Sequence, residues 1–175
     1  MGSTKSLLAI AAVLLLAVIL VYGYGWLFSG PAVRSADQWV AVAVGDGEVK
    51  QRQYAAVKLG ELGKPARKQI LSVLDQSKQP EVRVACIQSL TTLWDYRSMP
   101  LFLDLLNDPS AEVRLQAGET VGHLLRWDYQ FRKVNSDNQQ KERQAVIETM
   151  RSDWERFKRD RLCQAYIREK LGEDL

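Results

Sequence analysis

Apolar residues recur at helical spacing in two similar stretches of this chain. The stretch "EVRVACIQSLTTLWDY" covers residues 81–96, and "EVRLQAGETVGHLLRWDY" covers residues 112–129. Steps of three and four residues place the apolar positions of each stretch on one face of a helix. These positions are Val82, Cys86, Leu90 and Leu93 in the first stretch, and Val113, Ala117, Val121 and Leu124 in the second. Each stretch therefore predicts an amphipathic helix, and the second repeats the pattern of the first.

A third copy of the pattern emerges when the chain is aligned on one arginine. Arg52, Arg83 and Arg114 lie 31 residues apart. With these arginines in register, three further sets of residues align. They are Leu59, Leu90 and Val121, then Leu62, Leu93 and Leu124, and the small residues Ala55, Cys86 and Ala117. A second apolar run precedes each copy, at residues 39–44, 69–74 and 100–106. The first run alternates like a strand, but its length before a Gly-Asp-Gly turn suits a short helix. A period of this length predicts stacked helix-turn-helix units.

The stretches "QPEVRVACIQSLTTL" and "DPSAEVRLQAGETVGHL" resemble HEAT repeats, specifically the short bacterial type grouped with phycobilisome-lyase-like repeats. Gly60 and Gly122 occupy the family's glycine position, Thr91 replaces it in the middle copy, and Gln51 replaces a valine in the first. The resemblance covers residues 36–125. It implies an all-α fold, a short right-handed α-solenoid (an armadillo-like superhelix) of about three helical pairs with a concave face built from second helices. One pair cannot bury its own apolar face, so neighbouring pairs must stack.

The first thirty residues predict a membrane anchor. Residues 7–28 form an apolar run of 22 residues with an aromatic end, long enough for a helix to cross a bilayer. The alternative is a cleaved secretory signal, whose apolar region is usually shorter. Lys5 precedes the run and Arg34 with Asp37 follows it, so charge favours a cytoplasmic tail of residues 1–6 and an exported solenoid. Residues 29–35 are expected to be a linker.

The repeat pattern stops before the C-terminal segment. After a loop at residues 126–135, residues 136–175 predict one long helix that begins with a Ser136–Gln139 capping box. Its apolar stripe is Ile147, Met150, Trp154 and Phe157, and its expected ion pairs are Glu155–Arg159 and Arg156–Asp160. A helix with a single stripe packs most simply on the last repeat and covers the open end of the stack. A partner-binding or coiled-coil helix is the alternative.

The sequence Trp-Asp-Tyr ends each of the last two second helices, at residues 94–96 and 127–129. The structural interpretation is that Trp94 and Trp127 cover the end of the apolar face while each aspartate accepts backbone amides at the turn. The functional interpretation is that the tryptophans hold a partner, since such residues are enriched at binding hot spots. The outward positions of the second helices are further candidates for protein binding. These are Lys58, Glu61, Gln88, Thr92, Glu119 and His123.

Composition removes several other classes of function. The net charge is +3, too even to indicate a nucleic-acid partner or the basic groove of a HEAT-like DNA glycosylase. The two cysteines, Cys86 and Cys163, have no disulfide or metal spacing, and Cys86 falls at a small buried position. His123 is the single histidine, and no nucleophile lies beside a base in a known motif. We therefore expect no enzyme activity, no cofactor and no metal.

The sequence thus predicts a non-catalytic, membrane-anchored scaffold or adaptor that binds another protein. Two alternatives remain open. Family analogy alone suggests a lyase- or chaperone-like role in attaching a chromophore or cofactor, although fold does not transmit function. An accessory subunit of a membrane protein complex is the other.

Overall fold

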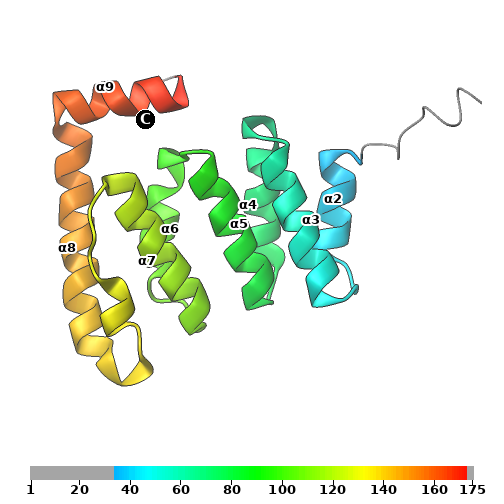
Figure 1. Cartoon of the computed structure of the whole chain (residues 1–175), viewed down its shortest axis with the longest axis horizontal. Coiled ribbons are helices and arrows are strands. Elements are labelled where there is room, and N and C mark those ends of the chain that lie inside the picture. Colours follow the sequence, from blue (N-terminus) through cyan, green and yellow to red (C-terminus); the bar gives the residue numbers. More distant parts are fainter. Residues whose placement is uncertain (1–33, 173–175) are drawn as a thin grey trace, which may run out of the picture. The chain divides into compact units, whose positions relative to one another are not determined.

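The computed structural model describes residues 34–172, which are entirely helical apart from turns and loops. Within this range the chain forms eight α-helices and four short 3-10 helices (Figure 1). None of these helices has both the length and the apolar character needed to cross a membrane. The predicted anchor at residues 7–28 lies outside the described residues.

Three helical pairs follow one another, as the repeat predicts (Figure 1). The first pair is α2 (Ala36–Val44) and α3 (Val49–Glu61), the second is α4 (Arg67–Gln76) and α5 (Pro80–Thr92), and the third is α6 (Met99–Leu105) and α7 (Ala111–Leu125). The strand-like run at residues 39–44 is helical in α2, so the short-helix interpretation is confirmed. Its N-terminus carries a capping box, in which Ser35 and Gln38 each bond the other's backbone amide.

The second helices α3, α5 and α7 pack side by side and supply much of the core. The aligned small residues Ala55, Cys86 and Ala117 are fully buried, which confirms the prediction for Cys86. The small side chains allow the helices to approach closely: a Cβ on Gly60 of α3 would lie 2.4 Å from the Ser89 hydroxyl of α5. The 31-residue period therefore describes one continuous stacked interior.

Burial differs at the aligned position that ends each copy. Leu62 is 37% exposed, Leu93 is partly buried, and Leu124 is fully buried. The cause is helix length, because Leu62 and Leu93 are the C-cap residues of α3 and α5, whereas α7 continues to Leu125 and keeps Leu124 within the helix. The predicted apolar face therefore reaches its full length only in the third pair.

The C-terminal segment forms two helices, so the prediction of one helix over residues 136–175 is wrong. Helix α8 covers Gln140–Arg159 and α9 covers Arg161–Leu171 (Figure 1). Asp160 separates them, because its backbone is extended and its carboxylate accepts hydrogen bonds from the amides of Leu162 and Cys163, which caps α9. Arg156 accordingly pairs with Asp153, at 2.7 Å, and the predicted pair with Asp160 does not form.

Helix α8 packs on α6 and α7 and covers the end of the stack, as expected for a capping helix. Its predicted apolar stripe is confirmed: Ile147, Met150 and Trp154 are buried, and Phe157 is partly buried against the core. The Glu155–Arg159 pair also forms, at 3.9 Å. The capping box at Ser136 does not, since the Ser136 hydroxyl contacts the side chains of Asn138 and Gln139 instead of a backbone amide.

Helix α9 turns back toward the earlier repeats. The Lys64 ammonium, at the start of the second pair, donates to the carbonyl oxygens of Lys170 and Leu171, at 2.7 and 3.1 Å. These carbonyls belong to the last turn of α9, where intrahelical donors are lacking. Ile167 is the buried residue of α9. One end of the stack is therefore covered by α8, and part of its side is covered by α9.

Candidate protein-interaction surface

The polar residues predicted on the second helices are exposed or partly exposed, and they bond mainly to one another. Lys58 pairs with Glu61 at 2.6 Å, and this pairing raises the pKa of Lys58. Gln88 donates to Gln116 of α7, the next second helix, and Thr92 donates to the Gln88 carbonyl. These four predicted residues (Lys58, Glu61, Gln88 and Thr92) are spread over α3 and α5 and line neither of the two grooves described below.

The remaining predicted residues lie close together near the end of α7. Glu119, His123 and Trp127 line one groove, and the His123 ring lies 4.7 Å from the ring of Trp94. Glu119 pairs with Arg132 at 2.5 Å across this groove. The structure thus gathers Trp94, Glu119, His123 and Trp127 at the C-terminal part of the stack.

The two tryptophans of the repeated Trp-Asp-Tyr sequence have different environments. Trp94 is partly buried against the core and lies edge-on to Tyr166 of α9, with ring centroids 6.4 Å apart. Trp127 is 67% exposed. The prediction that both residues cover the apolar face is therefore wrong for Trp127, which extends from the surface.

The difference arises from a shift of one residue at the helix ends. Trp94 itself has the left-handed conformation that ends α5, with φ of 55°, whereas Arg126 has it at the end of α7, with φ of 58°. Each helix then closes with the same backbone hydrogen bond to the carbonyl five residues earlier. The Asp95 amide donates to the Leu90 carbonyl, and the Trp127 amide donates to the Gly122 carbonyl. The second tryptophan therefore occupies the position of the first aspartate.

The two aspartates also differ from each other. Asp128 accepts the amide of Gln130 at 2.8 Å, as the sequence predicts. Asp95 is buried and accepts two hydrogen bonds from Nε of Arg67, both at 2.9 Å, together with the Ser98 hydroxyl. The prediction that both aspartates accept backbone amides is therefore wrong for Asp95, because its carboxylate bonds instead to Arg67 at the start of α4, in the same helical pair.

Trp127 stands between two grooves. We call the first the elbow groove, because it lies at the bend between α8 and α9. It has a volume of about 460 Å³ and is lined by Trp127, Tyr129, Asp153, Arg156, Phe157 and Asp160, among others. The second, the loop groove, has a volume of about 430 Å³ and is lined by Glu119, His123, Arg126, Trp127, Asp128 and Arg132, among others. Both volumes fall in the range of small binding sites.

Two glycines of α7 allow the chain after Trp127 to lie directly against that helix. A Cβ on Gly118 would lie 2.5 Å from the ring of Phe131, and a Cβ on Gly122 would lie 2.7 Å from the Trp127 carbonyl. Glycines four residues apart face the same side of a helix. The two glycines of the sequence "GETVG" are thus the signal that a segment packs closely on α7. They do not indicate which segment it is.

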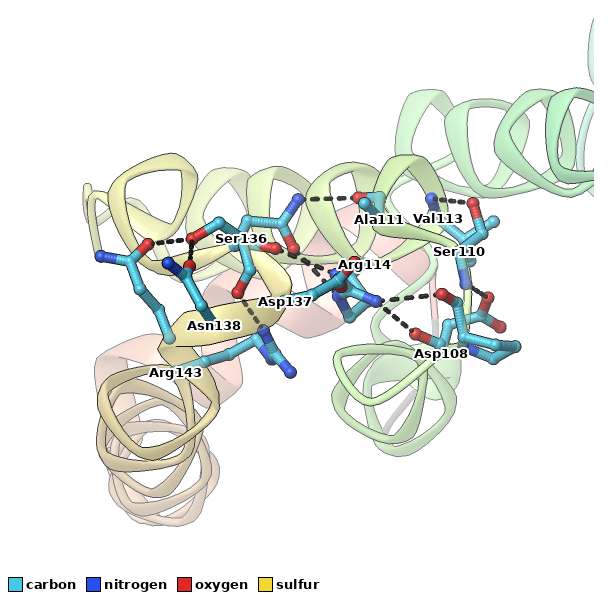
Figure 2. A network of polar contacts seen from close by, with 12 residues as sticks. Asp108, Ser110, Ala111, Val113, Arg114, Ser136, Asp137, Asn138 and Arg143 are labelled. Carbon is cyan, nitrogen blue, oxygen red and sulfur yellow. Dashed lines mark hydrogen bonds and ion pairs between the residues drawn. The ribbon is translucent and has the colours of Figure 1, made fainter.

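A buried arginine secures the far end of the same loop (Figure 2). The Arg114 guanidinium donates to the side chain and carbonyl of Asn135, to Asp137 at 2.6 Å, and to the carbonyls of Asp108 and Pro109. At the equivalent repeat position Arg83 pairs with Asp108 at 2.5 Å, and Arg52 donates to the Ala43 carbonyl. The repeated arginine therefore ties the second helix to the end of α2 in the first copy and to a loop in the other two, and in the third copy it fixes the segment that carries Trp127.

Further polar contacts of the same network extend this anchoring to α8. Asn135 donates to the Ala111 carbonyl at 2.7 Å, and Arg143 of α8 donates to the Ser136 carbonyl at 2.9 Å (Figure 2). Arg114, Asn135 and Arg143 are all buried. A buried network with its partners satisfied favours one arrangement of the groups it joins. Residues 126–139 are consequently held between α7 and α8, with Trp127 outward.

The elbow groove combines an aromatic lining with a small polar network. The Tyr129 hydroxyl donates to Asp153 at 2.8 Å, and burial followed by this hydrogen bond raises the pKa of Tyr129, so the hydroxyl remains a donor. Hydrogen bonds from Cys163 and Leu162 lower the pKa of Asp160. Burial raises the pKa of Cys163, and its bond to Asp160 adds to that rise. The groove therefore offers apolar surface and the ionised carboxylate of Asp160, without an activated thiol.

Groups suited to chemistry are not assembled elsewhere in the described part of the chain. Burial raises the pKa of Cys86 to about 12, so its thiol is inert as a nucleophile. Residues 34–172 contain no group of three or more His, Cys, Asp or Glu side chains placed to hold a metal ion.

Comparison with known families supports the resemblance over the repeats. Residues 36–122 match the family model described as HEAT repeats. HEAT repeats generally mediate protein–protein interaction and are typically non-catalytic, which is compatible with a scaffold. No curated protein and no solved structure matches the chain. The loop that carries Trp127, together with α8 and α9, follows the matched region.

Proposed function

We propose that this chain is a membrane-anchored, non-catalytic HEAT-repeat scaffold or adaptor that binds another protein through the surface around Trp127. The observation that carries the proposal is the exposure of Trp127 between two grooves, on a loop held in place from both sides. A large aromatic residue on a preorganised surface is the usual centre of a binding hot spot. The ordered loop lowers the entropic cost that a partner would otherwise meet.

The proposed location follows from the sequence. The apolar run at residues 7–28 would place the chain in a membrane as a single-pass protein, and the basic residue before it favours a cytoplasmic N-terminus with the repeats exported. An intact mass of 19.9 kDa for the purified protein is expected if the run is retained, whereas a smaller mass would indicate a cleaved signal. Replacing Leu16 and Val18 with arginine should release the protein from carbonate-washed membranes.

The side of the membrane can be tested with Cys163, which is partly exposed. A membrane-impermeant thiol reagent applied to intact cells should label Cys163 if the repeats are exported, and Cys86 should stay unlabelled because it is buried. Labelling that appears only after lysis would reverse the proposed orientation.

Binding is tested by affinity purification of the full-length chain from mild detergent, followed by mass spectrometry. We expect one stable protein partner, and Trp127→Ala should weaken its capture by about 30-fold or more, the effect of losing a hot spot. Leu162→Ala is the matched control, because Leu162 is 82% exposed but lines neither groove. Equal loss in both variants would refute a specific role for Trp127.

The same preparation separates the alternative functions. A pigment or cofactor that copurifies without a protein partner would favour the lyase- or chaperone-like role. Recovery of the chain only within a large assembly of membrane proteins would favour an accessory subunit.

A further inference from the structure

The two sides of the elbow groove have different chemical character. Trp127 and Tyr129 of the loop and Phe157 of α8 provide aromatic surface, while Asp153, Arg156 and Asp160 provide charge. An apolar side chain that entered this groove would be removed from water between aromatic rings, and its burial would stabilise a complex. The charged residues then decide which neighbours of that side chain are tolerated.

The charges of the elbow groove leave one carboxylate without a cation. Both oxygens of Asp153 are engaged, one by the Tyr129 hydroxyl and one by Arg156 at 2.7 Å. Arg156 is therefore paired within the groove, and the two aspartates with one arginine leave a net charge of −1 there. Asp160 accepts two backbone amides through Oδ1 and pairs with no cation among the residues that the structure describes. An incoming cation would meet an unpaired carboxylate there, and an incoming anion would meet repulsion.

The exposed tryptophan reinforces this preference. The face of an indole ring attracts ammonium and guanidinium groups. Elsewhere in this chain the same chemistry is already in use, because Lys170 lies 5.8 Å from the ring of Trp94 and Lys158 lies 5.5 Å from the ring of Trp154. Among the described residues no cation occupies the face of Trp127. Trp127 and Asp160 thus offer a cation two favourable surfaces in one groove.

We propose that the elbow groove binds a short segment of a partner protein in which an apolar side chain stands next to a lysine or arginine. The apolar side chain fills the space between Trp127 and Phe157, and the cation lies at Asp160 beside the Trp127 ring. This inference rests on the proposed function and specifies the chemistry of the partner. An acidic segment is disfavoured, because it would meet the unpaired carboxylate of Asp160 and would have to compete with Asp153 for Arg156.

The test selects peptides directly. A display library of random short peptides is passed over the full-length chain in lipid nanodiscs, and peptides that also bind the Trp127→Ala variant are removed. The expected result is a Trp127-dependent set in which an apolar residue lies within one or two positions of lysine or arginine. A Trp127-dependent set of acidic or uncharged peptides would overturn the charge assignment and leave the proposed binding role of Trp127 intact.

Two aspartates on opposite sides of Trp127 provide matched variants. Asp160→Asn keeps the cap of α9, because asparagine also accepts backbone amides, but it removes the charge. It should weaken the selected peptides by about two- to five-fold, the usual effect of a partly exposed ion pair. Asp128→Asn, in the loop groove, should leave their affinity unchanged. Equal weakening by both variants would show that only long-range charge acts.

The remaining outcomes separate this inference from the function on which it rests. If no peptide depends on Trp127 while capture of the protein partner still does, the partner presents a folded surface and the peptide assignment fails. If neither depends on Trp127, the proposed function fails as well. Self-association that Trp127→Ala abolishes would replace the peptide with a second copy of the chain.

Discussion

The two Trp-Asp-Tyr segments of this chain are identical in sequence and opposite in character. In residues 94–96 the tryptophan is partly buried, the aspartate forms an internal ion pair, and Tyr96 is fully buried. In residues 127–129 the tryptophan and aspartate are exposed, and Tyr129 is partly buried at the edge of a groove. The comparison shows that an identical tripeptide specifies neither burial nor role, because both depend on what packs over it.

Two neighbours account for most of the difference. The first segment lies in the middle of the stack, where Arg67 at the start of α4 bonds to Asp95 and Tyr166 of α9 lies against Trp94. The second segment follows a longer helix, which moves its tryptophan one residue past the left-handed position. The earlier copy is thus used to hold repeats together, and the later copy is free to contact other molecules.

The largest expected effect distinguishes the two tyrosines. Tyr96→Ala should lower the free energy of unfolding by about 4 kcal/mol, because it removes a fully buried ring that stacks on Phe157 and donates to the Leu124 carbonyl at 3.0 Å. Tyr129→Ala should cost about 1 to 2 kcal/mol, since part of its ring is already in water. Urea unfolding of the full-length protein measures both. Similar losses would mean that the two segments are equally buried.

An intermediate effect distinguishes the two aspartates. Asp95→Asn should cost about 2 kcal/mol, because the Arg67 guanidinium and the Ser98 hydroxyl lose a buried carboxylate. Asp128→Asn should change stability by less than about 0.5 kcal/mol, as expected for an exposed turn residue. The same unfolding measurement applies. A cost at Asp128 that matches the cost at Asp95 would contradict the assignment of the ion pair.

The smallest effect tests the one-residue shift at the helix ends. At position 94 the left-handed backbone strains any side chain, so Trp94→Gly should be more stable than Trp94→Ala by about 1 kcal/mol, although both lose packing. At position 127 the order should reverse or vanish, because Trp127 has no positive φ and glycine has only its entropic cost there. Thermal unfolding of the four variants gives the comparison. A more stable glycine variant at position 127 would show that Trp127, and not Arg126, has the left-handed conformation at the end of α7.

The hydrogen bonds between Lys64 and the end of α9 could not be predicted from the repeat pattern. The carbonyls of Lys170 and Leu171 meet Lys64 across more than 100 residues of sequence, and no local spacing announces such a contact. The break at Asp160 was also missed, because the apolar stripe of α8 continues smoothly to Phe157. An aspartate followed by residues that permit a second helix is a cap in one context and an ion-pair partner in another.

For other parts of the surface, the sequence predicts exposure or close packing but not which groups make the contacts. Exposure of the polar residues on α3 and α5 follows from the phase of the helices, but their pairing with one another and with Gln116 depends on how the side chains pack. Gly118 and Gly122 mark a close approach to α7, yet the identity of Phe131 and Trp127 as the approaching groups depends on the path of the loop. Arg114 was recognised as a repeat position, and its partners Asn135 and Asp137 lie outside the repeat.

The sequence by itself determined the helical pairs, their order and the residues that form their shared interior. It could do so because apolar periodicity and a 31-residue repeat act over one or two turns and between successive units. The tertiary structure decided which of two identical tripeptides is buried, where the C-terminal helix breaks, and how a loop and two helices enclose a groove beside Trp127. These outcomes depend on contacts between distant residues, whose free energies are comparable to those of the local alternatives with which they compete.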